Sequence, residues 1–172
     1  MTTKTRPNVR NVALLAVVAC VAVALDQLVK SLMRQMLAAG PLEFIPGVLR
    51  LVLVENPGAA FSMGEGASGL FAFVATGVTL ASLAWVWVDA EMPLSLVLGL
   101  ACVCGGGVGN LIDRVCKASV TDFLATEFID FPVFNVADCF ITCGVVIAFV
   151  AWCAYDKRRE AEGGGIDGKQ GR

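Results

Sequence analysis

The sequence predicts an α-helical membrane protein with four transmembrane helices and a small outward-facing β-sheet in the first long loop. Hydrophobic residues make up 57% of the chain, whereas soluble domains usually contain about 45–50%. The mean hydropathy is +0.75. Charged residues make up only 16% and are clustered, which leaves long uncharged runs. Runs of about 20 apolar residues are long enough to cross a bilayer.

Composition also excludes several kinds of site. The chain contains no histidine, which excludes Ser-His-Asp and Cys-His catalysis as well as histidine-ligated zinc and haem. The 7 cysteines form no C-x-x-C motif, and an odd number of thiols cannot all pair within one chain. We therefore expect them to act as small hydrophobic residues, and we expect neither a metal nor another cofactor. The net charge of -2 gives no reason to expect a nucleic-acid partner.

The first span is expected over about 11–31. An apolar run from Val12 to Leu25 is followed by D-Q-L-V-K at 26–30, and together they can cross a hydrocarbon core of ~30 Å. The basic start and the V-V-A-C sequence at 17–20 also resemble a cleavable signal, but the helical pattern continues beyond Cys20. Asp26 and Lys30 are spaced to pair on one helix face. Such a pair either anchors the helix at the membrane interface or supports an active site.

The first long loop covers about 34–68 and is expected to contain two short strands. Leu42 to Val54 is rich in β-branched and aliphatic residues, and a Pro-Gly pair at 46–47 interrupts it as a turn signal. These strands would form a small sheet on the membrane surface. The next segment, E-N-P-G-A-A-F-S at 55–62, makes a tight turn at Asn56, followed by small residues that permit close approach. A plain turn into the next helix is the simpler interpretation.

The second and third spans are expected over about 69–88 and 93–112, and neither contains a charged residue. Because only a short polar link at 89–91 joins them, they must form an antiparallel hairpin. Pro93 suits a helix start. The glycines of the third span, including Gly105 and Gly109 in a G-x-x-x-G pattern, predict close helix packing. A nucleotide-binding loop is excluded, because no strand precedes these glycines and no G-K-[ST] follows them.

The fourth span is expected over about 136–155, after a second long loop at about 113–135. Asn135 is a good N-cap residue and places Asp138 in the first turn, where free N–H groups and the helix dipole favour a carboxylate by ~0.3–1 kcal/mol. Helix capping is therefore an alternative to catalysis for Asp138. A basic K-R-R cluster at 157–159 ends the span, and residues 160–172 are expected to form a disordered cytoplasmic tail.

The distribution of charge predicts the orientation. Four spans put both termini on one side of the membrane, and the basic residues there predict that this side is the cytoplasm. These residues include Lys4, Arg6, Arg10, Lys157, Arg158 and Arg159. Polar residues from four segments then converge on the outer face, namely Asp26, Asn56, Asp113, Asp122 and Asp138. Independent anchors would not be expected to converge in this way.

Asp122 and Asp138 lie on different segments, where one apolar region ends and the next begins. Two carboxylates brought together at a partly dry site cannot both stay ionised, so the pair holds one proton. Such a pair suits peptide hydrolysis without a metal or a covalent intermediate. One carboxylate takes a proton from water, while the other polarises the scissile carbonyl group. Asp113 is a rival member, but the adjacent Arg114 favours a structural ion pair there.

Five segments, in their order and spacing, resemble the lipoprotein signal peptidases (signal peptidase II), which are aspartic proteases of the bacterial inner membrane. The segments are D-Q-L-V-K at 26–30, E-N-P-G-A-A-F-S at 55–62, G-G-V-G-N-L-I-D-R at 106–114, V-T-D-F at 120–123 and F-N-V-A-D at 134–138. The resemblance implies four transmembrane helices, an outward-facing β-cradle from the first long loop and catalysis by Asp122 and Asp138.

The resemblance also implies roles for further residues. The family positions that hold the site or the substrate are matched by Asn56, Asn110, Arg114 and Asn135. Supporting positions are matched by Asp26, Lys30, Gly106 and Asp113. The chain departs from the family at Ala118 and Ser119, where a glycine and a bulky residue are usual before V-x-D-F. If that position requires a positive φ, Ala118 costs about 1 kcal/mol.

Substrates and location follow from the same resemblance. The family acts on prolipoproteins whose lipobox cysteine already carries diacylglycerol, and it cuts just before that cysteine. The resemblance therefore implies prolipoprotein substrates, contact with membrane lipids and inhibition by globomycin-type compounds. We expect a multi-pass protein of the bacterial inner membrane that has its active site on the outer face and functions as a monomer.

Other classes of function are open to the same residues. A membrane transport or proton-relay subunit would use these carboxylates as carriers, but its acidic groups would lie near the bilayer midplane and not at helix ends. A small structural subunit would keep its function after Asp122→Asn. A Ser-Lys protease would combine Lys30 with Ser31 or Ser62, but Asp26 already matches Lys30.

Overall fold

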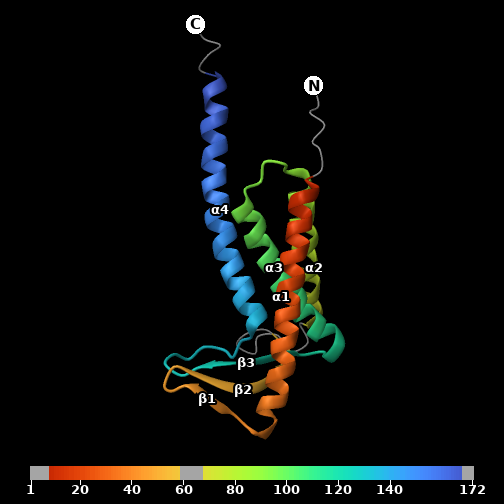
Figure 1. Cartoon of the computed structure of the whole chain (residues 1–172), viewed down its shortest axis with the longest axis vertical. Helices are drawn as coiled ribbons and strands as arrows, with labels where there is room; N and C mark the ends of the chain where they lie inside the picture. The colour runs from red at the N-terminus through yellow and green to blue at the C-terminus, as the bar shows by residue number, and fades with distance from the viewer. Residues whose placement is uncertain (1–7, 59–67, 168–172) are drawn as a thin grey trace.

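The computed structural model describes residues 8–58 and 68–167, which form four long helices and a three-stranded sheet (Figure 1). The helices are α1 (Val9–Met36), α2 (Ser68–Val88), α3 (Leu94–Lys117) and α4 (Val136–Asp167), and a short 3-10 helix, η1 (Leu37–Ala39), follows α1. The strands are β1 (Leu42–Ile45), β2 (Leu49–Asn56) and β3 (Val120–Thr126). All 4 long helices are apolar enough to cross a membrane, which confirms the predicted fold class.

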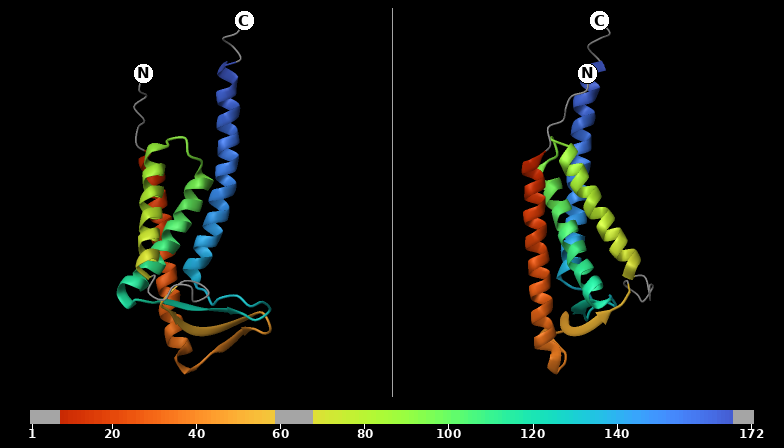
Figure 2. Two further views of the ribbon diagram at one scale, coloured as in Figure 1. Left: turned by 180° about the vertical axis from the view of Figure 1, so that it is seen from behind. Right: turned by 90° about the vertical axis from the view of Figure 1, so that its right-hand side faces the viewer.

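The sheet lies across one end of the helix bundle in every view (Figures 1 and 2). The first turn of α1 and the last turn of α4 lie toward the opposite end, as an even number of spans requires. α1 ends and α4 begins beside the sheet. The polar segments that the sequence places together therefore meet at one end of the bundle.

The glycines of α3 permit this helix to pack closely against its neighbours. A Cβ atom at Gly99 would lie 2.5 Å from the backbone nitrogen of Ala148 in α4. A Cβ atom at Gly105 would lie 2.6 Å from the Cβ atom of Ala22 in α1, and one at Gly106 would overlap the first turn of α4. Larger side chains at these positions would push the helices apart. The predicted packing role of the glycines is confirmed.

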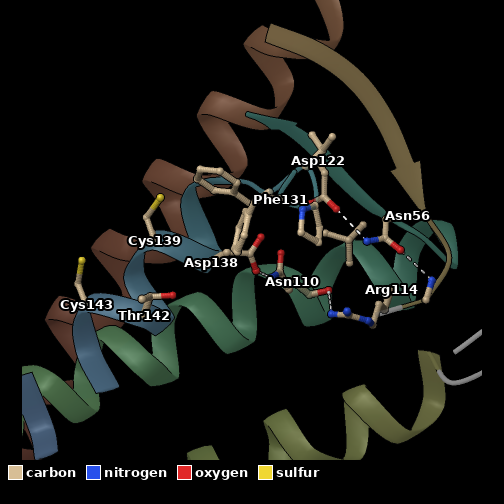
Figure 3. Close-up of a pocket in the computed structure, with 14 residues that line it drawn as sticks. Asn56, Asn110, Arg114, Asp122, Phe131, Asp138, Cys139, Thr142 and Cys143 are labelled. Carbon is tan, nitrogen blue, oxygen red and sulfur yellow. Dashed lines mark hydrogen bonds between the residues drawn. The ribbon is translucent and has the colours of Figure 1, made fainter. Parts of the chain in front are cut away.

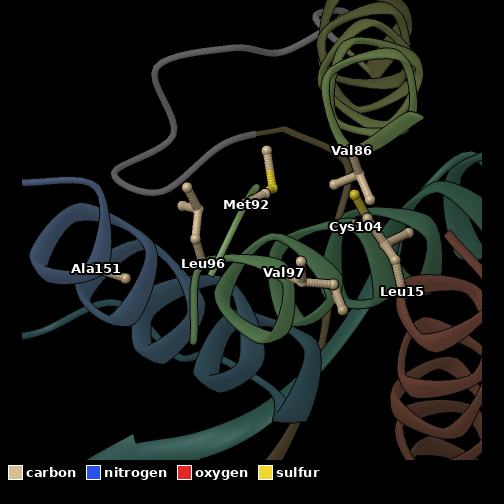
Figure 4. Close-up of a cluster of buried hydrophobic side chains, with 8 residues drawn as sticks. Leu15, Val86, Met92, Leu96, Val97, Cys104 and Ala151 are labelled. Carbon is tan, nitrogen blue, oxygen red and sulfur yellow. The ribbon is translucent and has the colours of Figure 1, made fainter. Parts of the chain in front are cut away.

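Two hydrophobic clusters hold the elements together. The larger one lies among the helices, and Figure 4 shows its side chains. It contains Leu15 and Cys104, both almost fully buried, so Cys104 acts as a small hydrophobic residue. The smaller cluster contains Leu37, Leu51 and Phe123 and joins the end of α1 to β2 and β3. This second contact fixes the position of the sheet at the end of the bundle.

The sheet is antiparallel with the strand order β1-β2-β3. Val54 pairs with Asp122 and Asn56 with Val120, so two of the predicted site segments lie side by side. The two strands predicted in the first loop are confirmed. A third strand, β3, belongs to the second loop and was not predicted. The first four residues of β3 are all buried, so the strand lacks the alternation of apolar and polar residues that identifies a half-buried strand in a sequence.

Three helices extend beyond the ends expected for their spans. α1 runs from Val9 to Met36. α3 continues to Lys117, so its last turns include positions 113 and 114, which were expected in a loop. α4 continues to Asp167, so the expected disordered tail is helical from 160 to that residue, and 168–172 lie outside the described residues. Charged residues end the apolar span, but Lys, Arg, Glu and Ala are good helix formers, and the K-R-R-E-A-E segment at 157–162 extends α4 beyond its span.

Ala118 ends α3 in the left-handed conformation, with φ 61° and ψ 4°. It is the one residue other than glycine with a positive φ among those that the structure describes. Position 118 therefore has the positive φ on which the expected cost depended. An L-residue with a Cβ atom is strained in this conformation.

Ala118→Gly is expected to stabilise the protein by about 1 kcal/mol, because glycine adopts this φ without steric cost. The melting temperature of the purified protein in detergent should rise. Ala154→Gly is the matched control, because Ala154 is exposed on α4 and glycine weakens a helix interior. The melting temperature of that variant should fall. A fall in both variants would contradict the strain at Ala118.

Candidate active site

A cavity of about 480 Å³ opens at the sheet end of the bundle, where β2, β3, α3 and α4 meet (Figure 3). It is lined by both aspartates of the predicted pair, Asp122 and Asp138, and by Asn56, Asn110 and Arg114. The other walls are mostly apolar and come largely from the second loop and the start of α4: Gly58, Val120, Phe131, Pro132, Val133, Phe134, Cys139, Thr142 and Cys143. Segments far apart in the sequence therefore share one cavity.

Asp122 lies in β3 and is 3% exposed. Its Oδ2 atom accepts a hydrogen bond from Asn56 Nδ2 at 3.0 Å, and its Oδ1 atom accepts one from Asn135 Nδ2 at 2.6 Å. Burial raises the pKa of Asp122 to about 6. The charge of Asp138 raises this pKa further, while the two hydrogen bonds and the charge of Lys30 lower it. Asp122 therefore holds a proton more readily than an exposed aspartate.

Asp138 lies in the first turn of α4 and forms a reciprocal cap with Asn135. The Asp138 N–H donates to Asn135 Oδ1 at 3.1 Å, and the Asn135 N–H donates to Asp138 Oδ2 at 3.0 Å. The predicted N-cap is confirmed. Asp138 Oδ1 accepts a hydrogen bond from Asn110 Nδ2 at 2.8 Å, and the side chain also lines the cavity. Capping therefore does not withdraw this carboxylate from the site.

Asn135 connects the two aspartates. Its Nδ2 atom donates to Asp122 and also to Asn110 Oδ1, the latter at 3.1 Å. As a result, every carboxylate oxygen of Asp122 and Asp138 accepts an amide N–H. These donors hold both carboxylates in fixed orientations.

A buried group of charges lies behind the pair. Lys30 is fully buried, and its Nζ atom lies 2.8 Å from Asp26 Oδ2 and 2.9 Å from Asp113 Oδ2. It also donates to Asn110 Oδ1 at 2.8 Å. The predicted pairing of Asp26 with Lys30 is confirmed, and its burial is inconsistent with an exposed anchor at the membrane interface. Asp26 Oδ1 accepts the N–H of Ala137 at 2.9 Å, so α1 also holds the first turn of α4.

The prediction of an ion pair between Asp113 and Arg114 is wrong. Asp113 pairs with Lys30, and its Oδ1 atom lies 3.1 Å from Lys117 Nζ. Neighbouring residues of a helix point about 100° apart, so Asp113 can face α1 while Arg114 faces the cavity. Asp113 therefore belongs to the buried charges and does not line the cavity with Asp122.

Arg114 brings a cation to the cavity wall. Its Nη1 atom donates to the backbone oxygen of Asn110 at 3.3 Å, and its guanidinium carbon lies 5.3 Å from the centre of the Phe71 ring. Its buried Nε atom has no hydrogen-bond partner among the described residues. Buried N–H groups without partners are rare in proteins. Such a donor at a cavity wall can bind an oxygen atom of a ligand.

The roles of several residues near the site were not predicted from the sequence. A Cβ atom at Gly109 would lie 2.7 Å from Asp26 Oδ2, so this glycine makes room for a buried carboxylate as well as for a helix. Gly106 contacts the α4 backbone and not the cavity. Thr142 and Cys143 line the cavity one turn beyond Asp138 on α4. Helical spacing from Asp138 is the signal that indicates these two residues.

Comparison with known proteins identifies relatives along most of the chain. The family model described as signal peptidase (SPase) II matches residues 18–154. The lipoprotein signal peptidase of Streptococcus pneumoniae is 38% identical over 140 residues, which are 81% of this chain and 92% of the relative. The lipoprotein signal peptidase of Enterococcus faecalis is 37% identical over 142 residues, which are 82% of this chain and 88% of the relative.

Solved structures give the same result for the fold. A bacterial membrane enzyme solved by the in meso method at 2.3 Å resolution aligns with a TM-score of 0.72 and 28% identity over 83% of this chain and 88% of that one. A second structure of this description, at 1.9 Å resolution, aligns with a TM-score of 0.70. The family match includes both aspartates of the cavity and all four spans in whole or in large part. The chain is therefore a multi-pass membrane peptidase and belongs to the signal peptidase II family.

Proposed function

We propose that the chain removes the signal peptide from prolipoproteins whose lipobox cysteine carries diacylglycerol, and that it cuts just before this cysteine. Asp122 and Asp138 form the catalytic pair. The observation that carries the proposal is the arrangement of these two carboxylates. They come from separate elements, every one of their oxygens accepts an amide N–H, and both line a largely apolar cavity at the end of the spans.

The environments of the two aspartates suggest different roles in hydrolysis. Asp122, whose pKa is raised to about 6, is the carboxyl group that holds the shared proton at the start, and it transfers this proton to the scissile carbonyl oxygen as water adds. Asp138 takes a proton from the attacking water. The water oxygen bonds to the carbonyl carbon and gives a tetrahedral intermediate. The C–N bond then breaks, the proton on Asp138 passes to the leaving amine, and Asp122 regains its proton from the collapsing intermediate.

The neighbouring polar residues position the reacting groups. Asn56, Asn110 and Asn135 hold the carboxylates. The unpartnered Nε atom of Arg114 is available to the substrate backbone or to the developing oxyanion. Positioned donors act strongly in such a cavity, because its apolar walls exclude water.

The walls of the cavity and its location support the proposed substrate class. Phe131, Val133 and Phe134 make one side apolar, and this side suits acyl chains that leave the bilayer with the substrate. Large exposed apolar residues also lie on the sheet and the second loop, among them Phe44 at 61% and Phe128 at 63% exposed. An exposed apolar surface of this kind suits contact with lipid.

Orientation and assembly complete the proposal. The basic residues at both ends of the chain support an orientation with the termini in the cytoplasm and the cavity on the outer face of the inner membrane. One chain contributes both aspartates and all their hydrogen-bond donors, so a monomer contains the whole reacting group. Globomycin-type inhibitors would bind in the same cavity.

A comparison of two precursors tests the substrate. Purified protein in detergent is given a prolipoprotein with diacylglycerol on its lipobox cysteine and the same prolipoprotein without lipid, and mass spectrometry identifies the products. The proposal predicts cleavage before the lipidated cysteine and little cleavage of the unmodified chain. Equal cleavage of both precursors would contradict the lipid requirement. Failure of well-folded protein to cleave either one would contradict the proposed peptidase reaction and favour a transport or proton-relay function.

A further inference from the structure

We propose that Lys30 is a positioning residue whose buried ammonium group fixes the direction in which the side-chain amides of Asn110 and Asn135 face. In this way it determines which atoms those amides present to the two aspartates. The proposal rests on the proposed function of the aspartate pair, and it assigns a role to a residue that does not line the cavity.

The first step is the orientation of Asn110. A lysine ammonium group is only a donor, so the group that it contacts at 2.8 Å must be the side-chain oxygen of Asn110. An amide has its oxygen and nitrogen on opposite sides. With Oδ1 directed to Lys30, Nδ2 must face away, and it donates to Asp138 Oδ1 at 2.8 Å. The charge of Lys30 therefore places a donor, and not an acceptor, against Asp138.

The second step transmits this orientation to Asn135. Asn110 Oδ1 also accepts a hydrogen bond from Asn135 Nδ2 at 3.1 Å. Since Asn110 presents an acceptor there, Asn135 must present its nitrogen, and that nitrogen donates to Asp122 Oδ1 at 2.6 Å. The side-chain oxygen of Asn135 then accepts the Asp138 N–H at 3.1 Å. One cation therefore fixes the donors that reach both aspartates.

The third step is that the surroundings of Lys30 hold its ammonium group in place. Asp26 and Asp113 contact Nζ from two sides, and the side chains of Asp26 and Lys30 are 0% exposed. Lys117 also pairs with Asp113, but its side chain is 35% exposed and its Nζ atom contacts the opposite oxygen of that carboxylate. Lys117 thus shares an ion-pair partner with Lys30 but donates no hydrogen bond to Asn110, which makes it a matched control.

Removal of the cation has a defined consequence for catalysis. Without Lys30, Asn110 is free to turn, and an oxygen directed at Asp138 would repel its carboxylate. The site would also lose a positive charge that stabilises the ionised form of Asp122. Both changes favour protonated carboxyl groups, so both limbs of the pH–rate profile should move to higher pH.

Other charged groups around the pair remain in place in such a variant. They come from α1, β2 and α3: Asp26, Arg34, Glu55, Asp113, Arg114 and Lys117. α2 contributes none, because it contains no charged residue. The shift expected for the Lys30 variant is therefore assigned to Lys30 and to the amides that it orients.

The test compares Lys30→Met with Lys117→Met on the lipidated precursor. Lys30→Met should move the pH optimum upward by about one unit and lower kcat more than it raises KM. Lys117→Met should keep the wild-type pH profile. Lys30→Arg retains a donor-only cation and should restore the position of the profile. A wild-type profile for Lys30→Met would overturn the proposal.

A double variant separates positioning from folding. Lys30→Met leaves one excess buried negative charge, and Asp26→Asn removes it while an oxygen remains for the Ala137 N–H. If Lys30 serves only the fold, Asp26→Asn/Lys30→Met should recover the wild-type pH profile, which would contradict the proposal. If Lys30 orients the amides, the double variant should fold and keep the upward shift.

A readout without catalysis separates this inference from the proposed function. With ¹⁵N-labelled asparagine, the side-chain amide resonances of Asn110 and Asn135 should move in Lys30→Met and stay in place in Lys117→Met. Unchanged resonances in Lys30→Met would overturn the positioning role, even if the wild type cleaves its substrate. If the resonances shift in Lys30→Met but the wild-type protein does not cleave its substrate, the positioning role is supported and the proposed reaction is contradicted.

Discussion

Asp122→Asn is expected to lower kcat for the lipidated precursor about 10³-fold, and Asp138→Asn is expected to do the same. Asparagine has nearly the same shape as aspartate, but it can neither hold the shared proton nor accept one from water. Asn56 and Asn135 each donate to Asp122, so an asparagine there keeps part of the hydrogen bonding and should fold.

The matched control for both variants is Asp130→Asn. Asp130 lies in the connection between β3, which contains Asp122, and α4, which contains Asp138. It is exposed and does not line the cavity. Its variant should retain the wild-type kcat. Melting temperatures in detergent should show that all three variants are folded. Substantial cleavage by folded Asp122→Asn would mean that Asp122 is not a member of the pair.

Gly109→Ala is expected to lower kcat about 10²-fold, although position 109 does not line the cavity. The added Cβ atom would lie 2.7 Å from Asp26 Oδ2, so the buried carboxylate must move. Asp26 holds both Lys30 and the N–H of Ala137, which directly precedes Asp138. A displaced Asp26 therefore moves the first turn of α4 and, with it, one member of the proposed catalytic pair.

Gly107→Ala provides the matched control for this prediction. It is the same substitution on the same helix, but its Cβ atom would lie 3.7 Å from Ala75, which is an ordinary contact. Its kcat should match the wild type. Equal losses of activity in the two variants would show that the effect comes from glycine content in α3 and not from displacement of Asp26.

The arrangement of spans is the part of the fold that the sequence predicts most directly. Hydrocarbon requires long uncharged helices, and residues 69–88 and 93–112 satisfy this requirement without exception. Helix ends are less predictable, because charge ends a span and not a helix. For this reason α3 continues through Asp113 and α4 continues to Asp167.

The third strand shows where local patterns stop being informative. β3 contains an acidic residue, and its first four positions are buried, because one face meets the end of α1 and the other meets the site. Neither periodicity nor turn chemistry indicates a strand there. Its pairing with β2 depends on contacts between residues 66 positions apart, such as Asn56 with Asp122.

The candidate site is also predictable from the sequence only in part. Motifs predict which residues gather, and the structure brings Asn56, Asn110, Arg114, Asp122 and Asp138 to one cavity. Partners are harder to predict, because sequence neighbours on a helix face different directions. Asp113 thus pairs with Lys30 and not with Arg114. The hydrogen bonds between Lys30, Asn110 and Asn135 join residues from three segments, and no local pattern encodes them.

The dependence of kcat on pH tests the central claim, a proton shared by Asp122 and Asp138, most directly. Wild-type protein and Asn56→Ala are assayed on the lipidated precursor from roughly pH 4 to pH 9, a range that covers perturbed carboxyl groups. Asp122 must hold its proton, so activity should fall as pH rises through its pKa of about 6, or somewhat higher once bound substrate excludes water. Asn56→Ala removes a hydrogen bond that lowers this pKa, so the descending limb should move to higher pH. A kcat that stays constant across the range, or a descending limb that moves to lower pH in Asn56→Ala, would contradict the shared proton.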